Sequence, residues 1–307
     1  MDLRRYREIN DRFERTLVYR LGGEAGFFSE LNNMVLAMVY CLAHEIRFVL
    51  YSGGANFGVC RGWEDFFMPF CEEAADPRHR VLNPRQPPKR MTMAQQLQIY
   101  RLKRGHGIDF LTHELWDRFR DRRLARRRFS FAGGRRVGQR SAARILMPVV
   151  WRYNAHTGSR VEAIKRSVPI FGEYLGLHIR RGDKSLEAPA VGVSRYVDKA
   201  RSVSSVRRIF ILTDDFRVFE EVARDHPDCA FSTLCTPSER GYVHREFLHL
   251  EPRAREARLL RLFASVDILA AAQHVVCTFS SNVGMYLGMR MDDDRVWGVD
   301  TKRWTIQ

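Results

Sequence analysis

Residues 174–183 read Tyr-Leu-Gly-Leu-His-Ile-Arg-Arg-Gly-Asp. The first six are apolar apart from one histidine, as in a buried strand, and the last four are charged residues and a glycine. Short apolar runs at residues 208–212 and 274–277 also end in polar residues, Thr-Asp-Asp and Thr-Phe-Ser-Ser-Asn. These strands alternate with helical segments, which predicts an α/β fold with a parallel sheet. Because ligands bind such sheets at the carboxyl ends of the strands, we expect the polar residues to form a site.

The first half of the chain gives a weaker pattern. Residues 1–20 are rich in charge and are predicted to form a polar helix, which the glycines of residues 21–26 interrupt. Apolar residues at helical spacing predict a helix over residues 27–43, followed by a strand over residues 47–51. A longer helix with a basic end is predicted over residues 91–128.

The chain has 307 residues, of which 45% are hydrophobic, so it can bury one large core or two ordinary ones. No uninterrupted apolar stretch approaches the roughly 20 residues that a membrane helix needs. Residues 1–5 are mostly charged, with no apolar region behind them, unlike a signal peptide. We therefore expect no transmembrane segment and a cytoplasmic location.

The formal net charge is +15, and arginine supplies most of the positive charge. Arginine suits bidentate contacts with phosphate or carboxylate, so nucleic acid, an anionic membrane surface and anionic small molecules are all candidate partners, and random drift of the surface is the alternative. The most basic segment, residues 118–136, has few of the interleaved aromatic residues that stack on bases. We interpret it as a solvated helix face and expect no nucleic-acid partner.

The residues that follow the first of these strands suit a diphosphate. Arg180 and Arg181 are adjacent, and a glycine follows them. Neighbouring side chains of a strand point to opposite faces, so one arginine is expected on the phosphates and the other on the loop. A nucleotide sugar that gives up its sugar leaves charge on the diphosphate, which a metal ion or fixed cations must stabilise. The alternative is an ordinary ion-pair cluster of Arg181, Asp183 and Lys184.

Three motifs, read together, resemble the signature of the fucosyltransferases that form α1,6 or α1,2 linkages or modify protein hydroxyls. They are residues 178–184 (His-Ile-Arg-Arg-Gly-Asp-Lys), residues 213–215 (Thr-Asp-Asp) and residues 277–281 (Cys-Thr-Phe-Ser-Ser). Lys184, and the glutamate and alanine at residues 187 and 188, favour the α1,6 group. The resemblance covers about residues 174–285; in the first half it is confined to the glycine loop and the helix after it.

This resemblance implies an α/β fold of the GT-B type, with two Rossmann-type lobes and a cleft between them. Residues 1–165 would form the lobe on the acceptor side, and residues 166–307 the lobe that binds GDP-fucose. It further implies an inverting mechanism with GDP-fucose as donor and an oligosaccharide or glycan as acceptor. No metal ion or other cofactor is expected.

The resemblance also assigns catalytic roles at the matching positions. Arg180 corresponds to the diphosphate contact, and Glu187 corresponds to the proposed general base, which takes the acceptor proton. Lys184 and Asp183 are expected beside it. The loop that carries Glu187 is one residue shorter than in the α1,6 group, so a solvated loop acid is the alternative interpretation of that residue.

The nucleotide is expected to contact the ends of the strands. Ser280 and Ser281 match phosphate-binding serines at a helix N-terminus, where hydroxyls and backbone N–H groups favour anions. Asp214 and Asp215 could instead cap the next helix, and one of the pair is expected to do only that. The full predicted nucleotide-binding set is His178, Arg180, Arg181, Asp214, Asp215, Asp267, Thr278, Phe279, Ser280 and Ser281.

Asp267 and the acidic run at residues 292–294 are two further candidates for a binding role. In the α1,6 group an aspartate on the helix before the third motif contacts guanine. Asp267 is about two residues from that position, a rotation of about 200° on a helix. Residues 292–294 (Asp-Asp-Asp) are interpreted as a solvated turn rather than as a metal-binding Asp-x-Asp motif, because no strand leads into them.

The sequence therefore predicts an enzyme that moves L-fucose from GDP-fucose to a saccharide hydroxyl, first of all to form an α1,6 linkage to N-acetylglucosamine. An α1,2- or protein O-fucosyltransferase is the nearest alternative. A basic nucleic-acid-binding protein and a non-catalytic sugar-nucleotide binder are alternatives of other classes.

Overall fold

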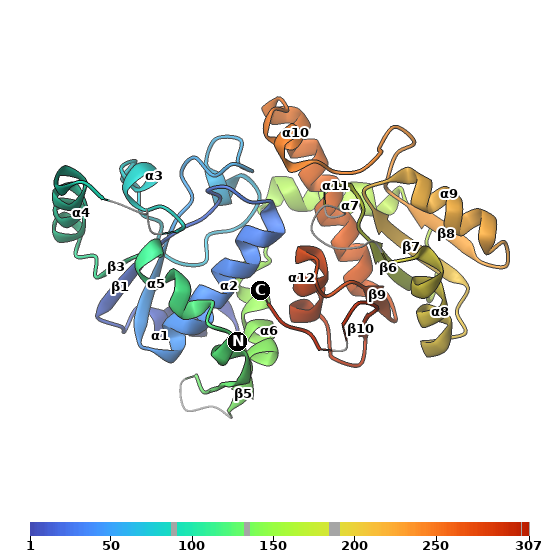
Figure 1. Ribbon diagram of the computed structural model, residues 1–307, viewed down its shortest axis with the longest axis horizontal. Helices are drawn as coiled ribbons and strands as arrows, with labels where there is room; N and C mark the ends of the chain where they lie inside the picture. Colours follow the sequence, from blue (N-terminus) through green and yellow to red (C-terminus); the bar gives the residue numbers. More distant parts are fainter. Residues whose placement is uncertain (87–90, 132–135, 184–190, 302, 307) are drawn as a thin grey trace. The chain divides into compact units, whose positions relative to one another are not determined.

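A computed structural model describes residues 1–86, 91–131, 136–183, 191–301 and 303–306 of the chain. They divide into two compact units, Met1–Asn154 and residues 155–306. Each unit is of the α/β type with a parallel sheet, which confirms the predicted fold class (Figure 1). In the described part of the chain, no helix is both long and apolar enough to cross a membrane.

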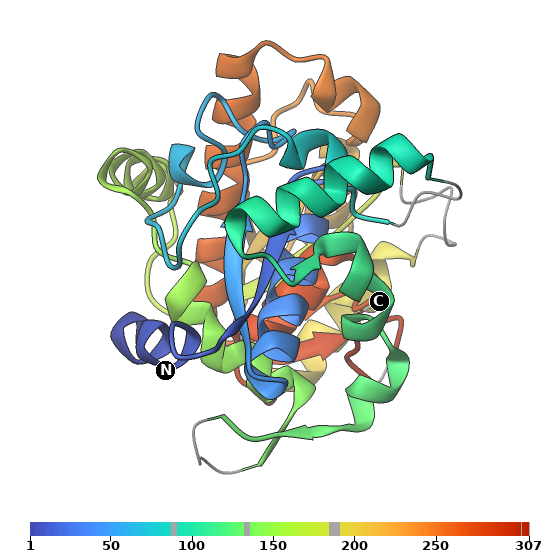
Figure 2. The ribbon, with the colours of Figure 1, turned by 90° about the vertical axis from the view of Figure 1, so that its left-hand side faces the viewer.

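The first unit contains three parallel strands surrounded by helices. Its elements are α1 (Leu3–Asn10), β1 (Arg15–Arg20), α2 (Phe27–Ala43), β2 (Ile46–Tyr51), η1 (Gly62–Asp65), α3 (His79–Leu82), α4 (Met93–His106), β3 (Phe110–Leu111), α5 (Thr112–Phe119), η2 (Arg122–Arg126), β4 (Arg128–Phe129), β5 (Val137–Gly138) and α6 (Gln139–Val150). The sheet order is β2-β1-β3, so β1 is central. Helix α2 packs on β1 and β2, and the sheet face that carries Val18 and Val49 packs against Ile99 of α4 (Figure 2).

Two predictions for this unit are wrong. Residues 1–20 hold a short helix and then β1 instead of one polar helix. Only the Leu-Val-Tyr centre of β1 is fully buried and both its ends are arginine, so the sequence signal is short; the strand forms because β2 and β3 pair with it on either side. Residues 91–128 hold several elements instead of one helix, because Gly107 adopts a left-handed backbone (φ 63°) that ends α4.

The second unit contains a five-stranded parallel sheet in the order β10-β9-β6-β7-β8. Its elements are α7 (Ala155–Arg166), β6 (Leu175–Ile179), α8 (Val193–Val203), β7 (Arg208–Thr213), α9 (Phe216–Asp225), β8 (Ala230–Thr233), α10 (His244–Leu248), α11 (Pro252–Ala271), β9 (Val275–Cys277), α12 (Asn282–Arg290) and β10 (Val296–Gly298). Helices α8 and α9 cover one face, and α11 covers the other (Figure 1). Helix α7, which the predicted division at residue 165 places in the first lobe, packs on α11 in this unit.

Period-two alternation sorts the residues of β6 between the two faces. Leu175, Leu177 and Ile179 join the apolar core under α8 and α9. His178 lies between Leu177 and Ile179 and so faces the side of α11. The same alternation directs the next residue but one, Arg180, out of the carboxyl end of the strand on that side.

Candidate functional site

All the strands of the second unit run parallel, so their carboxyl ends lie along one edge of the sheet. The loops at this edge carry the three motifs predicted to form a site. The loops after β6 and β7 meet through direct ion pairs and hydrogen bonds, and a segment after β8 joins them. The parallel topology therefore brings together residues that are far apart in the sequence.

Arg180 lies at the centre of this edge. Its guanidinium forms ion pairs with Asp214 at the end of β7 and with Asp183 in its own loop. It also lies over the ring of Tyr242, 4.8 Å from the centroid, and donates to the Tyr242 carbonyl oxygen at 3.4 Å. The side chain is 19% exposed, so it is held firmly but still reaches the surface.

Asp214 connects three segments of the site. One carboxylate oxygen accepts the backbone N–H of Arg181 at 2.7 Å, and the other accepts the backbone N–H of Tyr242 at 2.9 Å and pairs with Arg180. Its own carbonyl oxygen accepts the N–H of Gly241 at 2.8 Å. Asp214 is therefore a positioning residue for Arg180 and for both loops, and no nucleotide is needed to explain its place.

Gly182 permits the close approach of the two loops. Its φ of 48° lies in the left-handed region. A Cβ atom there would lie 2.3 Å from the Tyr242 carbonyl oxygen and 2.7 Å from a carboxylate oxygen of Asp214. Only glycine fits this position without moving backbone atoms.

Asp183 is fully engaged inside the loop. One carboxylate oxygen pairs with Arg180, and the other accepts the backbone N–H of His244 at 3.0 Å. Lys184 and Glu187, the other predicted catalytic residues, lie outside the described residues. Arg181 turns away from Arg180, and its guanidinium donates to the carbonyl oxygen of Val191 at 3.0 Å. Arg181 therefore holds the loop, and the contact of Arg180 with phosphates stays a prediction.

The loop between β9 and α12 holds the third motif. The Ser281 hydroxyl caps α12, because it accepts the N–H of Gly284 at 3.0 Å and donates to the Thr278 carbonyl oxygen at 2.8 Å. Ser281 is 5% exposed, and Phe279 is equally buried. Of the two serines, Ser280 is the more accessible one.

Asp300 anchors this loop from the end of β10. Its carboxylate accepts the N–H groups of Phe279 at 2.8 Å, Ser280 at 2.9 Å and Thr301 at 2.9 Å. Burial alone would raise the pKa of Asp300, but the hydrogen bonds from Ser280 and Phe279 outweigh it and hold the pKa below its usual value. The amides predicted to meet a phosphate are thus occupied by an internal carboxylate.

His178 lies beneath the site and is only 3% exposed. Its Nδ1 is 3.4 Å from the Ser281 hydroxyl oxygen. Burial, helped by the charge of Arg180, lowers the pKa of His178 to about 3. The imidazole is therefore neutral at physiological pH, and it shapes the site without adding charge.

This shift predicts a pH dependence of stability. In the unfolded chain a histidine has a pKa of about 6.5. Below that pH the unfolded state binds a proton that the folded state does not bind. The stabilising effect is present above about pH 6.5 and is lost as the pH falls towards the folded value. Urea unfolding at several pH values should show the wild type losing up to about 1.4 kcal/mol per pH unit more than His178→Gln. Equal pH slopes in the two proteins would contradict the neutral buried histidine.

Known proteins are similar to this chain in sequence and in fold. The sequence profile described as "Alpha-(1,6)-fucosyltransferase N- and catalytic domains" matches residues 143–289, which include all three motifs. Over this segment, which is slightly less than half of the chain, the sequence is similar to the α1,6-fucosyltransferase family.

Two curated members of the α1,6-fucosyltransferase family are similar to the chain. It is 25% identical over 299 residues to the α-(1,6)-fucosyltransferase of Drosophila melanogaster. This alignment covers 88% of this chain and 42% of that protein. It is 30% identical over 144 residues to the Caenorhabditis elegans α-(1,6)-fucosyltransferase, which covers 43% of this chain and 24% of that protein. The chain thus spans less than half the length of these relatives.

The fold is also that of solved fucosyltransferases. The crystal structure of the NodZ α-1,6-fucosyltransferase with GDP superposes with a TM-score of 0.53 at 16% identity, covering 90% of this chain and 92% of that one. NodZ has also been crystallised and soaked with GDP-fucose, and that structure superposes with a TM-score of 0.51. At this level of identity the likeness concerns the fold, and it confirms the predicted GT-B-like architecture.

Two predicted nucleotide contacts have structural partners elsewhere. Asp215 caps α9 and pairs with Arg217, whose hydrogen bond lowers the pKa of the Asp215 carboxyl. Asp267, the candidate for the guanine contact, forms an ion pair with Arg290. It lies six residues beyond Arg261, which is paired with the loop after β8, so it is about 9 Å further along α11 towards the amino end of β9. The structure does not bring Asp267 together with the other predicted residues.

The acidic run at residues 292–294 forms an exposed turn that leads into β10, as predicted. Sequence reasoning missed two residues of the site. Asp300 could have been found by the rule that revealed the others, because it lies two residues after the end of the last strand. Tyr242 could not, because only its packing on Arg180 in the folded chain marks it.

Proposed function

We propose that this chain transfers L-fucose from GDP-fucose to a saccharide hydroxyl, with inversion and without a metal ion. The first expectation for the acceptor is the 6-hydroxyl of an N-acetylglucosamine residue. In this reaction the acceptor oxygen bonds to C1 of fucose as the bond from C1 to the β-phosphate oxygen breaks. GDP leaves with the bonding electron pair, and the acceptor proton passes to a base.

The placement of Arg180 is the observation that carries this proposal. A cation fixed at the end of β6 stabilises the charge that grows on the departing diphosphate. Among the described residues, the contacts of Arg180 to Asp214, Asp183 and Tyr242 use three of the five N–H donors of a guanidinium, which leaves two donors for phosphate oxygens. The similarity of residues 143–289 to the α1,6-fucosyltransferase profile, and the GDP and GDP-fucose complexes of NodZ, support GDP-fucose as the donor.

The general base in this proposal is the one that the family resemblance implies. Asp183 has both carboxylate oxygens engaged, one by Arg180 and one by the His244 N–H, so it is poorly placed to accept a proton. Glu187, which the resemblance assigns as general base, therefore keeps this role in the proposal, and Lys184 is expected beside it.

Ligand binding in the presence of a chelator tests the proposal. With EDTA, GDP at a hundredfold excess over its Kd should raise the free energy of unfolding by about 2.7 kcal/mol, and GMP should have a smaller effect because it lacks the β-phosphate. Transfer from GDP-fucose to N-acetylglucosamine-containing glycans should proceed at an unchanged rate in EDTA, and linkage analysis of the product should show an α1,6 bond.

Other outcomes point to the alternatives. An α1,2 or protein-linked product would support GDP-fucose as the donor and show that the acceptor differs from the one proposed. GDP binding without transfer or donor hydrolysis would indicate a non-catalytic sugar-nucleotide binder. No response to GDP, together with salt-sensitive binding of arbitrary DNA, would refute the enzyme and favour the nucleic-acid-binding alternative.

A further inference from the structure

Arg20 is the last residue of β1, the central strand of the first unit's sheet. Its register partner on β2 is Tyr51, so the two residues lie side by side where both strands end. The alternation along a strand places Arg20 on the same face as Val18. In parallel sheets the carboxyl end of a central strand is the usual place for a ligand. The glycine loop at this end is part of the family resemblance, but that resemblance assigns no catalytic or binding role to a residue here.

The glycine loop that follows β1 is not available for an anion. Glu30, which is 1% exposed, reaches back from α2 and fills it. The carboxylate of Glu30 accepts the N–H groups of Gly22 at 3.1 Å and Ala25 at 3.0 Å, and it pairs with Arg85 at 3.2 Å. Because the protein supplies its own anion to these backbone amides, a ligand at this edge must be bound by side chains.

The guanidinium of Arg20 is available to bind an anion at this edge of the sheet. It is half-buried beside the glycine loop, where a Cβ atom on Gly23 would lie 3.9 Å from it. Burial lowers the pKa of Arg20. In the part of the chain that the structure describes, no hydrogen bond or ion pair engages this guanidinium. The nearby carboxylates of Glu24 and Glu30 partly offset its charge, but its N–H donors are left for an anionic ligand to accept.

Arg80 provides a second positive charge. It belongs to α3 and packs beside Gly54, where a Cβ atom would lie 3.4 Å from the Arg80 side chain. His79, its neighbour, stacks on the Tyr51 ring with 5.2 Å between centroids, which links α3 to the end of β2. Among the described residues, the guanidinium of Arg80 also has no hydrogen-bonded or ion-paired partner. Asp76, a carboxylate near it, is already held by Arg78 and His106.

We propose that Arg20 and Arg80 form an oxyanion-binding site at the carboxyl end of β1, which takes a phosphate or carboxylate group. Planar guanidinium groups match both anions through paired N–H donors. Two sources share this chemistry: a phosphate group of a small molecule, and an acidic group on the acceptor saccharide. In the second case the inference rests on the function proposed above and names the class of acceptor.

Binding measurements on matched variants test this site. Calorimetric titrations with GDP, GMP and glucuronate would compare the wild type with Arg20→Ala, Arg20→Lys and Arg80→Ala. Arg20→Ala should weaken binding of the anion by roughly ten- to a hundredfold, the range of a hydrogen bond to a charged group, and Arg20→Lys should lose less. The melting temperature of Arg20→Ala should stay near the wild-type value, because this side chain makes no described internal bond. Arg12→Ala is the control, since Arg12 is an exposed arginine before the opposite end of β1.

The pattern of losses identifies the source of the anion. A loss of affinity for GDP and GMP with unchanged glucuronate binding identifies a phosphate as the anion that Arg20 holds. A loss for glucuronate with unchanged GDP binding places an acidic saccharide there, and this result would stand even if the wild type failed to bind GDP and the proposed function fell. The inference is overturned if Arg20→Ala leaves the affinity for every one of these anions unchanged, or if Arg12→Ala weakens binding equally.

Discussion

Replacing Arg180 with alanine is expected to lower kcat by about a hundred- to a thousandfold, the usual effect of removing a donor that stabilises developing negative charge. The same change leaves the carboxylates of Asp214 and Asp183 facing one another without their shared cation. Breaking a largely buried ion pair costs roughly 3 kcal/mol, so the free energy of unfolding should also fall. Steady-state kinetics with GDP-fucose and urea unfolding would measure the two effects separately.

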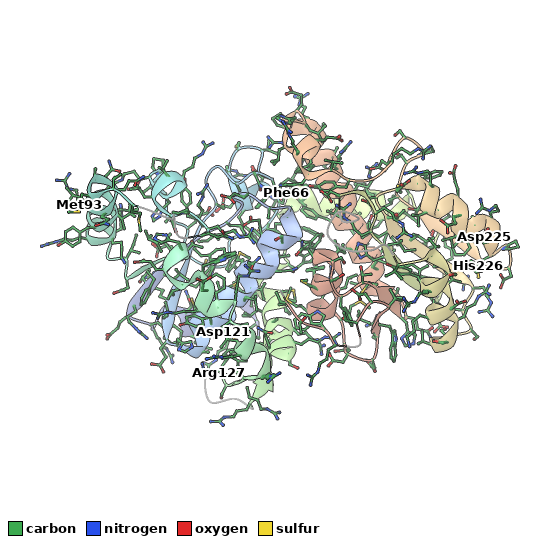
Figure 3. The ribbon with its side chains drawn as sticks, viewed as in Figure 1. Phe66, Met93, Asp121, Arg127, Asp225 and His226 are labelled. Carbon is green, nitrogen blue, oxygen red and sulfur yellow. The ribbon has the colours of Figure 1, made fainter. Side chains whose placement is uncertain are left out.

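Arg180→Lys separates charge from geometry. It keeps one positive charge and should recover part of the stability, but a single ammonium group cannot bridge two carboxylates and a diphosphate as a guanidinium can. Turnover should therefore remain low. Arg224→Ala is the matched control, because Arg224 is 72% exposed and pairs with Asp225, which lies at the end of α9 (Figure 3); it should leave stability and turnover close to the wild-type values. Near-normal turnover in Arg180→Ala would remove the central assignment.

Asp214→Asn is expected to weaken GDP binding by more than tenfold and to lower the free energy of unfolding by about 2–3 kcal/mol. Asparagine keeps one acceptor oxygen where the carboxylate offers two, and it loses the negative charge. The N–H groups of Arg181 and Tyr242, and the guanidinium of Arg180, would then compete for that oxygen. The loops after β6 and β8 would lose the group that joins them.

The neighbouring aspartate gives the comparison for this prediction. Asp215→Asn alters the cap of α9 and the pair with Arg217 and leaves the contacts of Arg180 in place. Its expected cost is about 1 kcal/mol, as for a helix cap. Calorimetry with GDP, together with urea unfolding of both variants, would test the contrast. Equal losses of GDP affinity in the two variants would show that Asp214 has no special positioning role.

The sequence predicted the second unit well, because its strands are apolar runs that end abruptly in polar residues. Parallel pairing of β6 with β7 then places the end of one beside the end of the other, and Arg180 meets Asp214 across 34 positions of the chain. How these groups share their hydrogen bonds could not be predicted. Asp214 and Asp215 look equivalent in the sequence, yet one joins the loops and the other caps a helix.

The third motif shows the same limit. A serine at a helix N-terminus can bind a phosphate or cap the helix, and the two roles leave the same residues in the sequence. The structure assigns the hydroxyl of Ser281 to the cap, and it gives the amides of Phe279 and Ser280 to Asp300. In the first unit, β1 was missed because its two arginine ends hid a buried centre of only three residues.

Glu30 has a consequence for how the two halves of the chain can evolve. Its carboxylate accepts the N–H groups of Gly22 and Ala25, so a side chain of the same unit holds the loop after β1. The first unit therefore needs no bound anion to keep this loop in place. Changes of donor preference can then accumulate among the loops of the second unit without disturbing this loop, whereas loss of Glu30 would demand a compensating change at Arg85.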